Sequence, residues 1–419
     1  MHRAAGNLAQ AGLTRSKLTA VRILVLIPTR NRSDLAQRAA SSALVESSAR
    51  NVQILISDNS DDAQEQVRLA DWSRQRAEHH LSYIRPPEPM EMARHWNWAI
   101  DEAVTRYHPT HLTVLTDRMV FRAGAIAELE TVARHCPDVA LSYLHDRVND
   151  LKRPVILEPR QWSGAVCVLQ AARLLWWSAD CVFHQCLPRL LNCLVPVAVF
   201  ERVKRSYGDY CGSLSPDFGF AYRYLATHSE FLYYDKALLT HYAIARSTGT
   251  SSQRGVMSKD ALNFRKNWSQ SRNEFLHTSY PEFMTVGNAI LEEYGAAKSR
   301  SSSPPFRNIN HRRYVNMLAK EIVQIEDPQA RKQMLLKLGR RGDRLRTIPI
   351  RLAWAFTLRA ADLGRAVLRL LVGAARFPPR PKFVTTEEAL AYNDRRKGPR
   401  LASTRHLAKF NPRPLALPE

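Results

Sequence analysis

The chain has 419 residues, of which 45% are hydrophobic and 24% charged, and these proportions exclude a largely disordered polypeptide. Its formal net charge of +22 indicates a phosphate-rich partner, either anionic lipid or nucleic acid, unless the arginines only cover a solvated surface. The six cysteines show no CxxC spacing, which argues against a disulfide framework and for a reducing, cytoplasmic setting.

Strand and helix patterns alternate over the first quarter of the chain. Residues 1–20 form a basic leader that lacks the apolar stretch of a secretory signal. Continuous apolar runs at 23–27 and 52–57 predict two strands buried on both faces of a parallel sheet. A helical spacing follows each run, at 34–44 and at 63–77.

The alternation continues with a short strand at 81–85, a helix at 90–107 and a strand at 111–115. This order predicts an α/β fold with a Rossmann-like, doubly wound and mostly parallel sheet. In such sheets ligands bind beyond the carboxyl ends of the strands. Here those ends are residues 28–32, 58–62 and 116–119.

The later part of the chain is more mixed. Apolar pieces occur at 166–169 and 193–199, a polar loop at 206–215, a helix at 218–227 and strands at 231–234 and 237–240. A run of Ser and Pro at 298–306 predicts a linker. Beyond it, residues 307–419 predict a mainly helical basic extension, because 301–419 carry 25 Lys or Arg against 9 Asp or Glu.

Five short motifs occur in an order that resembles the family 2 glycosyltransferases, which have the GT-A fold. They are ILVLIPTRNR at 23–32, DNSDD at 58–62, ARHWNWA at 93–99, LTDRM at 115–119 and SPDFGF at 215–220. The resemblance implies a catalytic domain over 21–297, with a nucleotide-sugar half at about 21–120 and an acceptor half at about 121–255. It implies inverting transfer of a sugar from a nucleoside-diphosphate sugar to a saccharide or lipid-linked saccharide, an activity of the hexosyltransferase type.

The resemblance also implies roles for particular residues. Asp217 would be the catalytic base, and Asp117 would lie near the diphosphate and a divalent cation, Mn²⁺ or Mg²⁺. His241 stands where the family often supplies a further metal or phosphate ligand. The residues expected to bind the nucleotide-sugar are Pro28, Thr29, Arg30, Asp58, Asn59, Asn97, Asp117 and Arg118.

The reaction itself requires one base and a stabilised diphosphate. A nucleoside diphosphate leaves without protonation of a sugar oxygen, so a single carboxylate such as Asp217 suffices to deprotonate the acceptor hydroxyl. A cation or fixed cationic side chains would stabilise the leaving group. Each candidate also has a structural alternative: Asp217 can cap a helix, Asp58 can close an Asx turn, and Asn97 can bond to backbone.

The metal site departs from the family pattern at Met119, which stands where a second carboxylate is usual. One carboxylate makes a poor Mg²⁺ or Mn²⁺ site, so Arg118, Arg246 or Arg254 could neutralise the diphosphate instead. A catalytically degenerate glycosyltransferase is therefore an alternative. The group of Cys181, His184, Cys186 and Cys193 lacks zinc-site spacing and predicts buried thiols.

The basic extension contains one amphipathic segment. On a helical wheel the charged residues of 351–376 fall within a wedge of about 120°, opposite Leu, Val and Phe. Such a helix can lie on the cytosolic face of a membrane or pack on the catalytic domain. A nucleic-acid-binding protein that uses this basic region is the non-enzymatic alternative.

Overall fold

In the computed structural model the described residues are 20–47, 51–76, 80–151, 153–247, 249–250, 275–301, 305–339, 380–396, 401 and 404–416. The first four strands of the sheet are parallel and lie in the order β3-β2-β1-β4. They are β1 (Ile23–Thr29), β2 (Val52–Asp58), β3 (Leu81–Ile84) and β4 (His111–Val114). This half confirms the strands expected from the continuous apolar runs.

The other half of the sheet is mixed. β9 (Cys193–Pro196) runs antiparallel between β4 and β6 (Leu141–Asn149), and β6 is parallel to β10 (Glu230–His241). β8 (Val166–Gln170) pairs with β10, while β5 (Met119–Phe121) and β7 (Val155–Glu158) add to β10 and β6. The sequence predicted no element between 116 and 158, where the apolar runs are shorter and more interrupted than those of β1 and β2.

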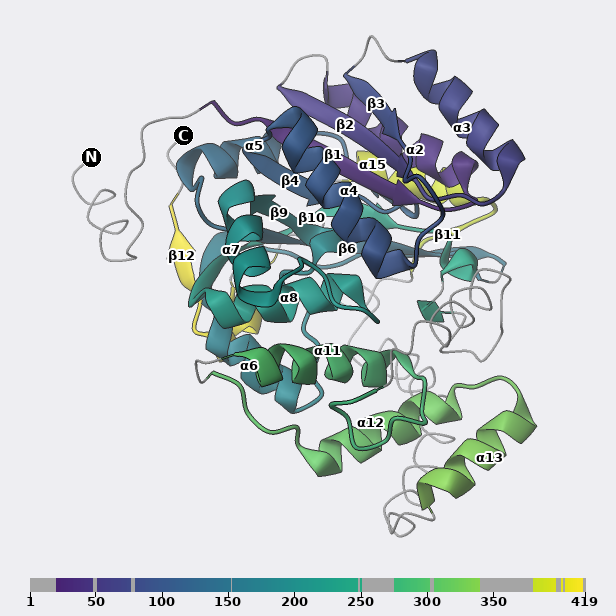
Figure 1. Cartoon of the computed structure of the whole chain (residues 1–419), viewed down its shortest axis with the longest axis vertical. Coiled ribbons are helices and arrows are strands. Elements are labelled where there is room, and N and C mark those ends of the chain that lie inside the picture. The colour runs from purple at the N-terminus through teal and green to yellow at the C-terminus, as the bar shows by residue number, and fades with distance from the viewer. Residues whose placement is uncertain are drawn as a thin grey trace, which may run out of the picture.

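Helices cover both faces of the sheet, so the expected doubly wound α/β class is confirmed (Figure 1). One apolar core holds α4 (Met92–Tyr107), α6 (Ala171–Ala179), α7 (Val197–Tyr207), α8 (Pro216–Thr227) and α11 (Val286–Arg300). The opposite core holds α2 (Ser33–Ser47), α3 (Ala63–Arg74) and α5 (Ala125–His135). Alternate residues of β1 enter the two cores, as the strand's period of two requires.

The C-terminal region is mainly helical, as expected. α12 (His311–Val323) and α13 (Pro328–Leu338) form a separate apolar cluster with α11. α15 (Thr386–Arg395) then lies beside β6 and β7, and two short strands rejoin the sheet: β11 (Lys382–Phe383) on β7 and β12 (Arg413–Leu415) on β8 (Figure 1). The sequence did not predict this return to the sheet, because strands of two or three residues carry no readable periodicity.

The described residues of the predicted linker pack on helices α6 and α11. Arg300 ends α11, the Trp176 indole donates to the carbonyl of Pro305 (3.0 Å), and Phe306 packs against Tyr294. The leader at 1–19 and the amphipathic segment at 351–376 lie outside the described residues. Among the helices that are described, none has the length and apolarity needed to cross a membrane.

Candidate functional site

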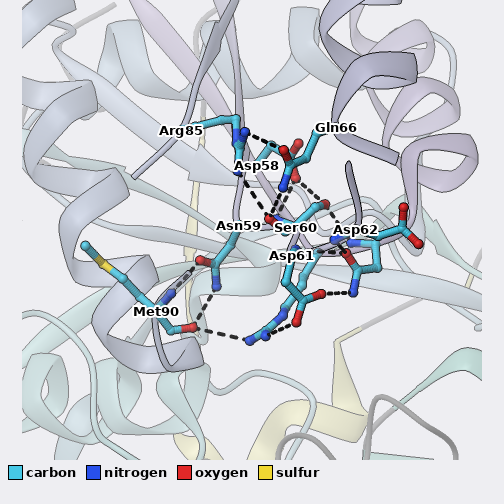
Figure 2. Close-up of polar contacts among 10 residues, drawn as sticks. Asp58, Asn59, Ser60, Asp61, Asp62, Gln66, Arg85 and Met90 are labelled. Atoms are coloured by element: carbon cyan, nitrogen blue, oxygen red, sulfur yellow. Dashed lines mark hydrogen bonds and ion pairs between the residues drawn. The ribbon is translucent and has the colours of Figure 1, made fainter. Parts of the chain in front are cut away.

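The loops that follow β1 and β2 are tied to each other and to the start of α4. Asn59 makes a reciprocal pair with Met90, its side-chain amide donating to the Met90 carbonyl and its oxygen accepting from the Met90 N–H, both at 2.8 Å (Figure 2). Arg30 bridges the same carbonyl (3.4 Å) and the carboxylate of Asp61 (2.8 Å). The strand ends predicted to bind a ligand therefore form one cross-linked edge.

Asp58 is fully buried at the end of β2, and its carboxylate accepts from the backbone and hydroxyl of Ser60 and from the Tyr83 hydroxyl. The first two contacts make the Asx turn that was the structural alternative for this residue. Burial and the bond to Asp58 raise the pKa of Tyr83, so Tyr83 stays a donor. A role for Asp58 in binding the nucleotide stays a prediction.

Asn97 bonds only to backbone in the described structure. Its oxygen accepts from the N–H groups of Tyr210 (2.8 Å) and Cys211 (3.1 Å), and its amide donates to the Ala93 carbonyl (2.9 Å). These contacts fasten the segment before α8 to α4. The residue thus has a clear structural role, and donor binding by Asn97 stays a prediction.

Asp117 lies buried where the chain leaves β4. Its carboxylate accepts from the Thr29 hydroxyl (3.0 Å) at the end of β1, and the Arg32 guanidinium lies 3.6 Å away. Thr29 and Pro28 are themselves buried in the last positions of β1. The structure thus brings together two of the strand ends that the sequence predicted to meet.

His241 ends β10 and stands beside Met119 in the antiparallel register with β5. The Arg118 guanidinium lies 2.8 Å from its Nε2, and burial, followed by the charge of Arg118, lowers the pKa of His241 well below the usual value. A neutral imidazole that accepts this bond carries its proton on Nδ1.

The residues predicted to hold a divalent cation fit such an ion poorly. Asp117 already accepts from Thr29, and the Nε2 of His241 faces a guanidinium. Within the described ranges no group of three or more His, Cys, Asp or Glu side chains is placed to hold a metal. Mg²⁺ needs near-octahedral oxygen ligands, which this pair does not supply. Metal binding by Asp117 and His241 stays a prediction.

Asp217 is the second residue of α8, and Ser215 occupies the N-cap position, so Asp217 is not the cap. The Ser215 hydroxyl donates to its carboxylate (3.3 Å). Burial raises the pKa of Asp217, and the nearby charge of Arg189 opposes that rise. Arg118, in the turn after β4, also interacts electrostatically with Asp217.

The segment before Asp217 is held from both sides. Opposite Asn97, the buried carboxylate of Glu293 on α11 accepts from the N–H groups of Leu214 (2.7 Å) and Ser215 (3.1 Å). Burial raises the pKa of Glu293 to about 7. The sequence did not identify Glu293, since an isolated Glu in a helix carries no motif.

Three arginines that interact electrostatically with His145 were also missed. Arg147 lies on β6, Arg160 follows β7, and Arg189 precedes β9. The one available signal was the spacing of two between His145 and Arg147, which places both on one side of a strand. Of the other arginines considered, Arg246 pairs with Asp34 (2.8 Å) and Arg254 lies outside the described residues.

The described cysteines are free thiols, as predicted, and Cys186 and Cys193 are buried while Cys181 is partly buried. The Nδ1 of His184 lies 3.0 Å from the Sγ of Cys186, within a mainly apolar core. No disulfide or zinc role arises from this group.

The fold and the site define an α/β protein in which charged side chains gather at one edge of the sheet. They come from the ends of β1, β4, β5, β6 and β10, and they include groups that interact with Asp217 at the start of α8. No protein-family model matches the sequence, and no curated protein matches it. Among solved structures, residues 1–349 of TarS from S. aureus in complex with UDP-GlcNAc are similar at 12% identity and a TM-score of 0.43. That alignment covers 80% of this chain and 92% of the other.

The same TarS fragment with UDP gives 11% identity, a TM-score of 0.41, and coverage of 80% of this chain and 91% of the other. A longer TarS structure gives 11% identity and a TM-score of 0.40, and the alignment covers 74% of this chain but 50% of the other, so this chain spans about half of that length. Identities and TM-scores at this level carry no argument about the activity of this chain.

Proposed function

We propose that this chain is an inverting glycosyltransferase of the GT-A type, which moves a sugar, as a hexosyltransferase does, from a nucleoside-diphosphate sugar to a saccharide or lipid-linked saccharide. The observation that carries the proposal is the position of Asp217. Its carboxylate lies at the start of a helix, has a raised pKa, and interacts with Arg118 and Arg189 at the polar end of the sheet.

In the proposed reaction the ionised Asp217 removes the proton of the acceptor hydroxyl. The hydroxyl oxygen forms a bond to the anomeric carbon while the bond from that carbon to the β-phosphate oxygen breaks. The electron pair leaves with the nucleoside diphosphate, and a single displacement inverts the anomeric configuration. A base whose pKa lies above that of a free carboxylate accepts the proton more readily.

The donor side of the proposal uses the cross-linked strand ends. The Arg30–Asp61 and Asn59–Met90 contacts hold the loops of β1 and β2 in fixed positions, which a binding site for a nucleotide requires. Asp117, Arg118 and Thr29 lie at the neighbouring strand ends. Ligand sites in open α/β sheets occur at this edge.

The test is release of nucleoside diphosphate from a panel of nucleotide-sugars, with mono- and oligosaccharides and lipid-linked saccharides as acceptors, and with thermal shifts recorded for the same donors. Asp217→Asn should lower turnover by about 10²- to 10⁴-fold and leave the donor's thermal shift unchanged. Asp71→Asn, an exposed carboxylate on α3, is the matched control. Donor binding without any turnover would favour the degenerate enzyme, and Asp217→Asn with normal turnover would remove the base assignment.

We further propose attachment to the cytosolic face of a membrane through the basic segment 351–376. Its amphipathic sequence pattern supports this part of the proposal. The protein should then sediment with vesicles that contain phosphatidylserine and stay in the supernatant with phosphatidylcholine alone. Binding to duplex or single-stranded nucleic acid in place of vesicles would support the alternative partner.

A further inference from the structure

Four guanidinium groups gather around two neighbouring imidazoles at the end of β6 and β10. The rings of His145 and His241 are 6.1 Å apart, and Arg147 is paired with His241 in the parallel register of the two strands. His241 interacts electrostatically with Arg118, Arg147 and Arg189, and His145 interacts with Arg147, Arg160 and Arg189. We call Arg118, Arg147, Arg160 and Arg189 the arginine cluster.

The arginine cluster differs from the other arginines at this edge of the sheet. Within the described ranges none of its four guanidinium groups forms an ion pair, whereas Arg30, Arg32 and Arg246 at the same edge each pair with an Asp. The Nε atoms of Arg118 and Arg147 are buried, and neither has a hydrogen-bond partner in the part of the chain that is described.

Three carboxylates lie near Arg118, and two of them have other partners as well. Asp117 also lies close to Arg32, and Asp150 accepts from the N–H groups of Ala243 and Ile244. Asp217 interacts with both Arg118 and Arg189. Gathering like charges in a partly buried place lowers stability, so a fold that keeps such a cluster points to an anionic ligand there.

The chemistry of a diphosphate matches the arginine cluster. Guanidinium groups bind phosphate oxygens through paired hydrogen bonds, keep their charge at all working pH values, and act without reorganisation when charge develops on a leaving group. Arg118, Arg147 and Arg189 are each partly exposed and Arg160 is exposed, so a ligand can reach them. Asp117 and His241, by contrast, give a divalent cation only two ligand groups, and the Nε2 atom of His241 faces a guanidinium.

We propose that the arginine cluster, and not a divalent cation, binds the diphosphate of the nucleotide-sugar and stabilises the nucleoside diphosphate as it leaves. This inference rests on the proposed function and deepens it. It makes the transfer independent of metal: the electron pair of the broken sugar–phosphate bond comes to rest on an oxygen held by guanidinium groups, and the proton of the acceptor goes to Asp217.

The probe is inorganic pyrophosphate, titrated calorimetrically into the full chain in buffer with EDTA and again with Mn²⁺. Wild-type protein should bind in EDTA, with at most a twofold change when Mn²⁺ replaces it. Arg147→Gln should bind roughly 10- to 100-fold more weakly, as expected for loss of charged hydrogen bonds. Arg74→Gln, an exposed arginine on α3, removes the same charge and should bind normally.

Binding that requires Mn²⁺, or equal binding by Arg147→Gln and wild type in EDTA, would overturn the inference. Loss of a guanidinium that has no described ion pair should not unfold the protein, and the thermal midpoint of Arg147→Gln checks this. Arg189→Gln provides a second variant if Arg147→Gln does not fold. Failure of the proposed function is distinguishable: pyrophosphate would still bind to the arginine cluster, while no nucleotide-sugar on the panel would be bound or turned over.

Discussion

Glu293 is a buried carboxylate whose ionisation is coupled to the shape of the site. It holds the backbone of Leu214 and Ser215, which lie three and two residues before Asp217. Its pKa is raised by burial from 4.5 to about 7, so the folded state retains a proton that the unfolded state releases between these values. The stability contributed by this group is therefore lost as the pH rises from about 4.5 through 7.

We expect the free energy of unfolding of wild type to fall between pH 5.5 and pH 8, by up to about 2 kcal/mol from this group. Glu293→Gln keeps an acceptor for both N–H groups and cannot ionise. Its free energy of unfolding should therefore decrease less between the two pH values. Urea unfolding at the two pH values measures the difference. Glu201→Gln, an exposed carboxylate on α7, should retain the wild-type dependence. An unchanged dependence in Glu293→Gln would contradict the assignment.

At the scale of single residues, the sequence located the strand-end side chains but not their partners. Thr29 and Asp117 were predicted at one site and do meet. For Asp58 and Asn97 the structural alternatives were also weighed, and the contacts observed are those alternatives. Arg147, Arg189 and Glu293 could not be predicted, since each comes from a segment whose position depends on packing across the sheet.

Helix α8 packs closely against the segment that precedes it in the chain. A Cβ atom at Gly219 would lie 2.3 Å from the backbone nitrogen of Gly212 and 2.8 Å from the carboxylate of Glu293. Backbone atoms on the far side cannot move away as a flexible side chain would. The close approach of α8 thus depends on a glycine at this position.

Gly219→Ala should lower the free energy of unfolding by about 1–3 kcal/mol, because the added methyl group over-packs this contact. It should also lower turnover, since Asp217 lies two residues before it on the same helix. Gly249→Ala is the matched control: its nearest atoms would be 3.9 Å away, and its stability should change by at most about 0.5 kcal/mol. Urea unfolding compares the two, and equal stabilities would mean that the helix shifts freely.

At the scale of elements, prediction succeeded where one pattern was long enough. β1 and β2 are seven residues each and mostly apolar, and their bounds were found to within two residues. β6, whose nine residues mix His, Asp, Arg and Asn with apolar positions, was not predicted. Its polar side chains serve the site and the contact with α15, and this dilutes the hydrophobic pattern that identifies a strand.

The C-terminal region forms buried hydrogen bonds to the strands that carry part of the site. Asn393 of α15 is fully buried and donates to the carboxylate of Asp146 (3.0 Å) and to the hydroxyl of Thr240 (2.9 Å). Asp146 lies between His145 and Arg147 on β6 and also pairs with Arg122 (3.2 Å). One buried amide thus joins β6, which carries Arg147, and β10, which carries His241, to a helix far along the chain.

Asn393→Ala leaves the oxygens of Asp146 and Thr240 short of a donor, so the free energy of unfolding should fall by about 1–3 kcal/mol. Pyrophosphate affinity should fall with it if β6 shifts. Arg395→Ala, an exposed change on the same helix, should leave both quantities unchanged. Urea unfolding and calorimetry check the pair. If the two variants behave alike, α15 is not a support for the site.

The pairing of β12 with β8 joins residues 413–415 to residues 166–168. During synthesis the N-terminal strands emerge first, and β8 is complete long before its last neighbour exists. Roughly 245 residues separate the two strands in the sequence. The pairing of β12 with β8 therefore forms late, after the intervening chain has been ordered. A ribosome-bound chain halted before residue 380 would therefore display an open sheet edge, a natural place for a chaperone to bind.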